Sequence, residues 1–324
     1  MASRTDQTGK MKFVTSPIGN CTFMGTGECN DTEIYVPDTY EGKAVTKLCP
    51  RAFYKRGDIT AVHLPETLDI IGQCAFEGCK SIKSIRIPKS VTYFCYEAFV
   101  ACECLERVEI DDLYAWCNAY FENEDANPLH NGAALCLDGK PITHLVIPAE
   151  LKSTGYASFS GCSSVTRVTV PSGIKTVSAY TFCECENLIS AELAEGIERI
   201  RAYAFRGCES LTDINLPSTL SAIDECAFYG CTSLGEIALP DGIDELPDFA
   251  FHSCSSLRVV TLGKSLGRIG GFAFAGCGRL EKIIFGGSAA EWNAIPKYED
   301  WDKDTPDYTV YCSDAVIKKS KYQV

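Results

Sequence analysis

A phenylalanine recurs every 23 residues along most of this chain. It occupies nine positions, in a run of three and a run of six: Phe53, Phe76 and Phe99, then Phe159, Phe182, Phe205, Phe228, Phe251 and Phe274. Repeats of about 20 to 50 residues are typical of solenoids, in which each repeat forms one coil that contacts only its neighbours. The spacing therefore predicts an array of short stacked coils, and we expect a single continuous array.

Other apolar residues keep fixed distances from each phenylalanine, at plus six, plus nine and plus eleven, as in Leu234, Ile237 and Leu239 after Phe228. This L-x-x-L-x-L pattern ends in an alternation that predicts a short, half-buried strand. Proline often follows and would end the strand, because it has no N–H. We expect one turn of helix or 3₁₀ helix on the opposite wall, just before the next phenylalanine. One coil cannot offset the entropy of its own ordering, so neighbouring strands must pair in parallel.

The array is interrupted between Phe99 and Phe159. One period before Phe159 stands Cys136, and the apolar columns return after it at Ile142, Leu145 and Ile147. This predicts a tenth coil, with an insertion over residues 111–134. The Asp-Gly pair at residues 138–139 predicts a tight hairpin turn.

The insertion resembles the C-terminal segment. Trp116 precedes Cys136 by 20 residues, as Trp292 precedes Cys312. Ser288, three residues before a glutamate, has capping-box spacing and predicts a helix start. We interpret the second copy as an end cap, which a solenoid needs to cover its last coil. The first copy is then a cap-like insertion, and a protruding binding loop is the alternative.

These patterns divide the chain into four parts. Residues 1–10 form a disordered tail or an appended segment, 11–47 a β-rich N-terminal cap, 48–286 the solenoid with its insertion at 111–134, and 287–324 a C-terminal cap.

Blocks such as AFYGCTSLGEIALP at residues 227–240 carry a family resemblance. Over roughly residues 34–286 the pattern resembles the BspA-like, or Treponema-type, leucine-rich repeat family. The resemblance implies an α/β repeat solenoid: a right-handed leucine-rich-repeat horseshoe of about ten 23-residue coils, with a parallel sheet on its concave face. It also implies an adhesin-like protein used for protein recognition at a bacterial surface, or a secreted one.

The net charge of −13 argues against nucleic-acid binding, which needs a basic footprint. No apolar run reaches the length of a membrane span, and the first 20 residues lack the apolar core of a signal peptide. We therefore expect a soluble chain without a visible export signal.

The chain has 19 cysteines, and eight of them stand three residues after the aromatic position. A periodic column is better explained as small buried side chains than as disulfides. The pairs Cys102/Cys104 and Cys183/Cys185 are weak zinc candidates, because no second pair lies at ligand spacing. We expect core thiols, no metal and no cofactor, which suits a reducing or anaerobic setting.

Motifs for catalysis are missing from the sequence. The four histidines are isolated, and neither a nucleophile elbow nor a phosphate-binding loop is present. A site assembled from distant residues is the alternative, but we predict that the chain is not an enzyme.

A binding surface is predicted at the plus-eight and plus-ten positions, which point out of the parallel sheet onto the concave face. The candidates for contact with a protein partner are His63, Arg86, Arg107, Glu109, His144, Arg167, Glu192, Asp213, Asn215, Glu236 and Lys282. Basic residues dominate the first half of this series, and acidic residues cluster in the second. A structural spacer and a glycan-binding protein are the alternatives; the second is disfavoured because these positions carry no aromatic platform.

Overall fold

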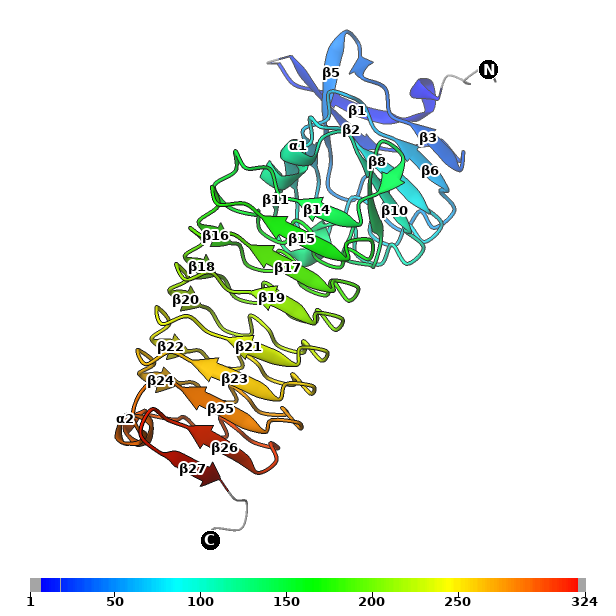
Figure 1. Cartoon of the computed structure of the whole chain (residues 1–324). Helices are drawn as coiled ribbons and strands as arrows, with labels where there is room; N and C mark the ends of the chain where they lie inside the picture. Colours follow the sequence, from blue (N-terminus) through cyan, green and yellow to red (C-terminus); the bar gives the residue numbers. More distant parts are fainter. Residues whose placement is uncertain (1–6, 18, 320–324) are drawn as a thin grey trace. The chain divides into compact units, whose positions relative to one another are not determined.

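The computed structural model of the chain describes residues 7–17 and 19–319. It forms two compact units rather than the single array that we expected from the repeat. The N-terminal unit comprises Met1–Ile142 and Ala157–Ser164, and the C-terminal unit comprises Thr143–Tyr156 and Val165–Val324. Each unit is a solenoid of stacked coils with parallel strands (Figure 1).

The strands of the L-x-x-L-x-L segment, here called the ladder strands, run along one side of each unit. Those of the N-terminal unit are β3 (Glu33–Tyr35), β6 (Ala61–His63), β8 (Ser84–Ile87), β10 (Arg107–Ile110) and β12 (Ala134–Leu137). Those of the C-terminal unit are β14 (His144–Val146), β15 (Arg167–Val170), β17 (Ser190–Leu193), β19 (Asp213–Asn215), β21 (Glu236–Ala238), β23 (Val259–Leu262), β25 (Lys282–Phe285) and β26 (Tyr308–Tyr311).

Short strands form the opposite wall. In the N-terminal unit they are β5 (Lys43–Leu48), β7 (Ile70–Ile71), β9 (Tyr93–Phe94) and β11 (Tyr120–Phe121). In the C-terminal unit they are β16 (Thr176–Val177), β18 (Arg199–Ile200), β20 (Ala222–Ile223), β22 (Glu245–Leu246) and β24 (Arg268–Ile269). Within the described residues, the predicted turn of helix before the phenylalanine is not formed. The residue two positions before it has a positive φ, as in Cys74 at 51°, which a right-handed helix does not allow.

Strand pairing confirms the leucine-rich-repeat solenoid and its register. Residues 23 apart face each other, for example Ser84 with Arg107 and Val259 with Lys282. The described residues contain 13 ladder strands, however, and not ten. The additional ones are β3, β12 and β26, and each pairs in parallel with a neighbouring ladder strand.

The phenylalanines form a buried stack through each core. In the N-terminal unit the ring centroids of Phe53 and Phe76 are 4.9 Å apart, and Phe23 of β2 (Asn20–Gly25) extends the stack at 5.2 Å from Phe53. In the C-terminal unit Phe274 ends the stack and meets Trp301 edge-on at 6.1 Å. Neighbouring coils are thus joined through identical side chains, which is why the 23-residue period is so regular.

The periodic cysteines also lie in the core. Six of them place Sγ 3.1 to 3.2 Å from the carbonyl oxygen of the phenylalanine one coil earlier: Cys79, Cys102, Cys208, Cys231, Cys254 and Cys277. Burial raises the pKa of these thiols, in Cys102 to about 12. The column is therefore a row of protonated S–H donors to backbone carbonyls.

The interruption takes a different path from the one expected. Cys136 does not start a coil; it lies in ladder strand β12, opposite Glu109. The insertion contains α1 (Leu113–Asn118) and the 3₁₀ helix η2 (Glu124–Ala126). In regular coils the amide of one phenylalanine donates to the carbonyl of the residue just before the next phenylalanine. The Phe99 amide donates to the carbonyl of Asp125, so Ala126 fills the phenylalanine position. After β12 the chain returns in the predicted Asp-Gly hairpin through β13 (Lys140–Pro141). The boundary between the two compact units follows directly, between Ile142 and Thr143.

The C-terminal segment repeats this order of elements. Helix α2 (Ala289–Ala294) begins with the predicted capping box of Ser288 and Glu291, and β26 returns through β27 (Val316–Lys319) as β12 does through β13. Trp116 of α1 packs edge-on against Phe121, and Trp292 of α2 lies 5.5 Å from Phe285. The assignment of both segments as caps stays a prediction that this packing supports.

The N-terminal segment is antiparallel at its start. β1 (Lys12–Thr15) pairs with β2, and β4 (Thr39–Tyr40) pairs with β5. Within the predicted tail, Gln7 is buried and the 3₁₀ helix η1 (Thr8–Lys10) follows it. Residues 1–6 of that tail lie outside the described residues. No helix in the described part of the chain has the length and apolar character needed to cross a membrane.

Candidate recognition face

The ladder strands turn their plus-eight and plus-ten side chains away from the core, with Cys136 of β12 as a buried exception. In β8, for example, Ser84 and Arg86 are exposed while Ile85 and Ile87 are buried. All of the predicted contact residues occupy such positions, and together these positions are here called the outward face. His63, Arg86, Arg107 and Glu109 belong to the N-terminal unit, whereas His144, Arg167, Glu192, Asp213, Asn215, Glu236 and Lys282 belong to the C-terminal unit.

In the N-terminal unit, carboxylates outside the predicted contact residues offset the predicted basic character. Arg86 contacts Glu66 Oε1 at 2.5 Å and Asp111 Oδ2 at 2.7 Å. His63 Nε2 lies 2.8 Å from Glu33 Oε1. The outward face of the N-terminal unit therefore offers no excess of positive charge.

The acidic cluster of the second half forms a patch without basic partners. Glu192, Asp213 and Glu236 are exposed on consecutive coils, in β17, β19 and β21, and are here called the acidic triad. Within residues 7–17 and 19–319, no lysine or arginine forms an ion pair with any of the three. Among the described residues, the only hydrogen-bond donor to the Glu192 side chain is Thr169, at a long 3.5 Å. This patch carries uncompensated negative charge.

Asn215 lies beside the triad but is occupied by the fold. Its Oδ1 accepts a hydrogen bond from the Leu193 amide at 2.9 Å, and its Nδ2 donates to the Leu193 carbonyl at 2.8 Å. Both backbone groups at the end of β17 are thereby satisfied, so this side chain has a structural role in addition to any contact with a partner.

An apolar patch adjoins the triad toward the C-terminal end. Its apolar members are Ala238, Val259, Ile284 and Tyr311, here called the apolar patch. Thr261 lies between Ala238 and Ile284 in the register, and Ile284 is opposite Tyr311. Tyr311 is 42% exposed, and Lys282 Nζ lies 4.7 Å from its ring centroid. The outward face therefore does carry aromatic residues, contrary to expectation, because β3 and β26 add Tyr35 and Tyr311 to it.

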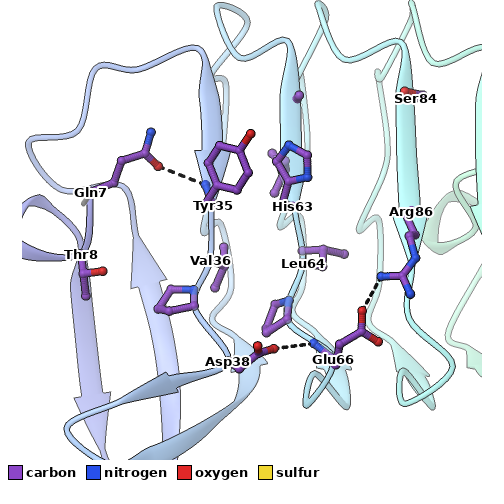
Figure 2. A pocket seen from close by; sticks show the side chains of 14 residues that line it. Gln7, Thr8, Tyr35, Val36, Asp38, His63, Leu64, Glu66, Ser84 and Arg86 are labelled. Atoms are coloured by element: carbon purple, nitrogen blue, oxygen red, sulfur yellow. Dashed lines mark hydrogen bonds and ion pairs between the residues drawn. The ribbon is translucent and has the colours of Figure 1, made fainter. Parts of the chain in front are cut away.

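A pocket of about 530 Å³ opens on the outward face of the N-terminal unit (Figure 2). Tyr35 and His63 stack in parallel at one side of it, with ring centroids 4.1 Å apart. Arg86 stands at the other side and reaches toward Glu66. Asp38 Oδ1 accepts a hydrogen bond from the Glu66 amide at 2.8 Å, so two carboxylates line the lower rim.

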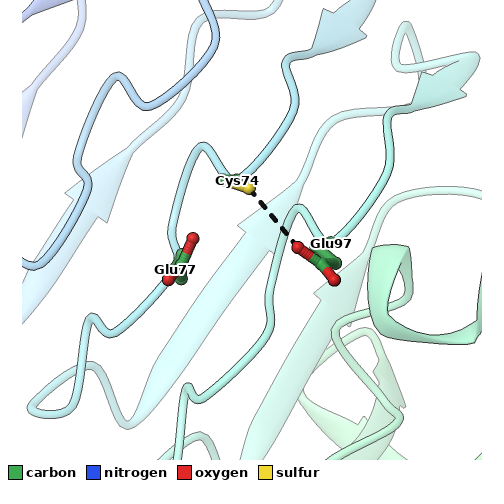
Figure 3. Close-up of side chains that lie close together, drawn as sticks. All are labelled: Cys74, Glu77 and Glu97. Carbon is green, nitrogen blue, oxygen red and sulfur yellow. Dashed lines mark hydrogen bonds between the residues drawn. The ribbon is translucent and has the colours of Figure 1, made fainter.

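Three possible metal ligands lie together elsewhere on the N-terminal unit. The ligand atoms of Cys74, Glu77 and Glu97 are within 4.8 Å of one another, and the Cys74 Sγ is 3.7 Å from Glu97 Oε2 (Figure 3). One thiol and two carboxylates are donors that Zn²⁺ accepts. Burial and both carboxylates raise the pKa of the Cys74 thiol to about 11, however, so a metal would have to displace its proton. The group comes from adjacent coils, which is why no sequence motif marks it.

The residues missed by the repeat pattern still had a local signal. The I-Y-V-P stretch at residues 34–37 has the plus-nine to plus-twelve pattern of a ladder strand, with Tyr35 in the outward position. Tyr311 ends the alternating stretch at residues 308–311 in the same way. Glu66 and Asp111 lie in the turns just after ladder strands, where their reach toward Arg86 depends on the fold.

Stacked 23-residue coils, parallel ladder strands and the L-x-x-L-x-L columns define a leucine-rich repeat solenoid protein. Six copies of the BspA type leucine-rich repeat region match residues 14–127, 134–200 and 175–294. The chain therefore belongs to the BspA type leucine-rich repeat family.

The chain is similar to solved structures of bacterial proteins, among them the following three. A leucine-rich repeat protein from Bacteroides ovatus is 21% identical, with 93% of this chain and 98% of that chain covered and a TM-score of 0.46. A leucine-rich cell surface protein from Faecalibacterium prausnitzii is 23% identical, with 90% and 97% covered and a TM-score of 0.46. The pneumococcal vaccine antigen PcpA is 16% identical, with 95% and 98% covered and a TM-score of 0.55, which shows a shared fold. No curated protein sequence matches the chain.

Proposed function

We propose that this chain is a non-enzymatic recognition module that binds a protein partner through the outward face of its ladder strands. The observation that carries the proposal is the acidic triad beside the apolar patch on the C-terminal unit. The family resemblance extends the proposal to an adhesin-like role at a bacterial surface.

The apolar patch has the composition of a binding centre. Protein interfaces concentrate aromatic and aliphatic side chains at their core and place polar groups at the rim. Ile284 and Tyr311 are the side chains that a partner would cover, and Lys282 lies over the tyrosine ring at 4.7 Å. The eight ladder strands of this unit, spaced about 4.8 Å apart, give a surface on the order of 35 Å long.

The acidic triad indicates a partner with basic residues. Its carboxylates are exposed and have no lysine or arginine partner within the described residues. Complementary charge across an interface raises the association rate and selects among partners. A protein with basic side chains next to an apolar segment would satisfy both parts of the surface.

The test is affinity capture with three versions of the chain, from bacterial lysate and host-cell surface extract in parallel. The first is native; the second carries Glu192→Lys, Asp213→Lys and Glu236→Lys. The third carries Glu150→Lys, Glu186→Lys and Glu209→Lys, an equal charge change at exposed positions of the same unit that are off the outward face.

We expect the native and control chains to retain the same partner and the triad variant to retain at least tenfold less. A partner held equally by all three would contradict the proposed face. Failure to capture any protein would favour a structural spacer and overturn the proposal.

A further inference from the structure

We infer that the pocket of the N-terminal unit binds a cationic side chain, a guanidinium or an ammonium group, presented by a peptide or protein. This inference deepens the proposed function, because it names the chemistry of a partner group at a second place on the outward face. It rests on four properties of the pocket: its shape, its charge, its stacked rings and its apolar floor.

The hollow exists because the outward residues beside it are small. Ala61 of β6 and Ser84 of β8 stand at the plus-eight position, where longer side chains would fill the space between neighbouring strands. Val36 and Leu64, 5% and 8% exposed, form the floor, and two prolines continue it. The resulting volume of about 530 Å³ accommodates a long side chain with its aliphatic stem on this floor.

The charges around the hollow favour a cation. Asp38 and Glu66 line it, and Glu33 and Asp111 stand next to lining residues. Arg86 is the only lysine or arginine among the described lining residues, and it is already held by Glu66 and Asp111. Asp38 forms no ion pair within the described residues; its Oδ1 accepts only the Glu66 amide. The excess negative charge would repel an anionic ligand and attract a basic one.

The stacked rings are held in place before any ligand arrives. Tyr35 and His63 are parallel to within 2°, and Glu33 Oε1 contacts both the tyrosine hydroxyl, at 2.5 Å, and the histidine Nε2, at 2.8 Å. Gln7 fixes the Tyr35 backbone by accepting its amide at 3.0 Å (Figure 2). A cation above an aromatic face gains about 0.5–2 kcal/mol, and a guanidinium also stacks on a planar ring.

The test compares two peptides that differ only in charge. Acetyl-Gly-Arg-Gly-amide and acetyl-Gly-citrulline-Gly-amide are titrated into the full chain, and chemical shifts of the His63 ring protons report occupancy. Citrulline replaces the guanidinium by a neutral group of nearly the same shape. We expect saturable binding of the arginine peptide and at least tenfold weaker binding of the citrulline peptide.

Two variants locate the site. Asp38→Asn keeps the oxygen that accepts the Glu66 amide and removes the charge, and we expect about fivefold weaker binding of the arginine peptide. Glu103→Gln makes the same charge change at an exposed position of the N-terminal unit that is outside the pocket, and should leave the affinity unchanged. Equal binding of both peptides, no saturable binding, or equal loss in both variants would overturn the inference.

The triad variant separates this inference from the proposed function. Its altered residues lie on the C-terminal unit, so it should bind the arginine peptide normally even though it loses the partner. Peptide binding without partner capture supports the pocket and contradicts the proposed function. Partner capture without peptide binding supports the proposed function and contradicts the pocket.

Discussion

Replacing Phe205 by alanine tests the stacked core that joins neighbouring coils. Phe205 is fully buried, and its ring lies between those of Phe182 and Phe228, at centroid distances of 5.3 and 5.4 Å. Truncating a buried phenylalanine costs about 3–5 kcal/mol. We expect the upper part of that range, about 4–5 kcal/mol, because two stacked contacts of about 0.5–1.5 kcal/mol each are lost together. A solenoid has no contacts beyond neighbouring coils to compensate for the loss.

The assay uses the distribution of tryptophans between the units. Trp116 belongs to the N-terminal unit, and Trp292 and Trp301 belong to the C-terminal unit. In a Trp116→Phe background, urea unfolding followed by tryptophan fluorescence therefore reports the unit that contains Phe205.

The matched control is Phe272→Ala in the same background. Phe272 is half-exposed and stacks on Phe249 at 5.1 Å, so its loss should cost below about 1.5 kcal/mol. A loss below about 1 kcal/mol for Phe205→Ala, or one equal to the control, would refute the stacked core as the source of stability.

Two further predictions concern backbone conformation and thiols. Ala101 has a φ of 58° at the position where the preceding coil has Gly78, so Ala101→Gly should raise the free energy of unfolding of the N-terminal unit by up to about 1 kcal/mol, and Gly78→Ala should lower it by about as much. Urea unfolding followed by Trp116 fluorescence measures both in a background with Trp292→Phe and Trp301→Phe, and destabilisation by Ala101→Gly would contradict the expected strain. Ellman's reagent at pH 8 should react rapidly with exposed Cys104 and slowly with buried thiols such as Cys254, whose pKa is raised by burial. In denaturant all 19 cysteines should react; a lower count would reveal disulfides.

The repeat pattern predicts the core so well because each coil packs against a copy of itself. Once Phe228 is assigned to the core, Phe205 and Phe251 must occupy the same place one coil away, and the strand register follows. The same regularity misplaces Cys136: the 23-residue period makes it the first residue of a coil, whereas it lies in ladder strand β12, just before the Asp-Gly hairpin that the sequence does predict.

The charge of the outward face was less predictable than its position. Arg86 was correctly placed on it, but its ion pairs come from Glu66 and Asp111, in turns whose geometry the period does not specify. Tyr35 was assigned to a cap because its strand lies before the first phenylalanine of the series. The net charge of a surface depends on ion pairs between side chains of neighbouring coils. The repeat columns do not show which side chains form such pairs.

The central claim is that the C-terminal unit recognises a protein through the acidic triad and the adjoining apolar patch. The most direct test is the amount of partner captured by the triad variant, relative to the native chain and to the equally charged control. Retention by the native chain and the control, with at least a tenfold loss in the triad variant, is the predicted result. Equal retention by all three chains would contradict the claim.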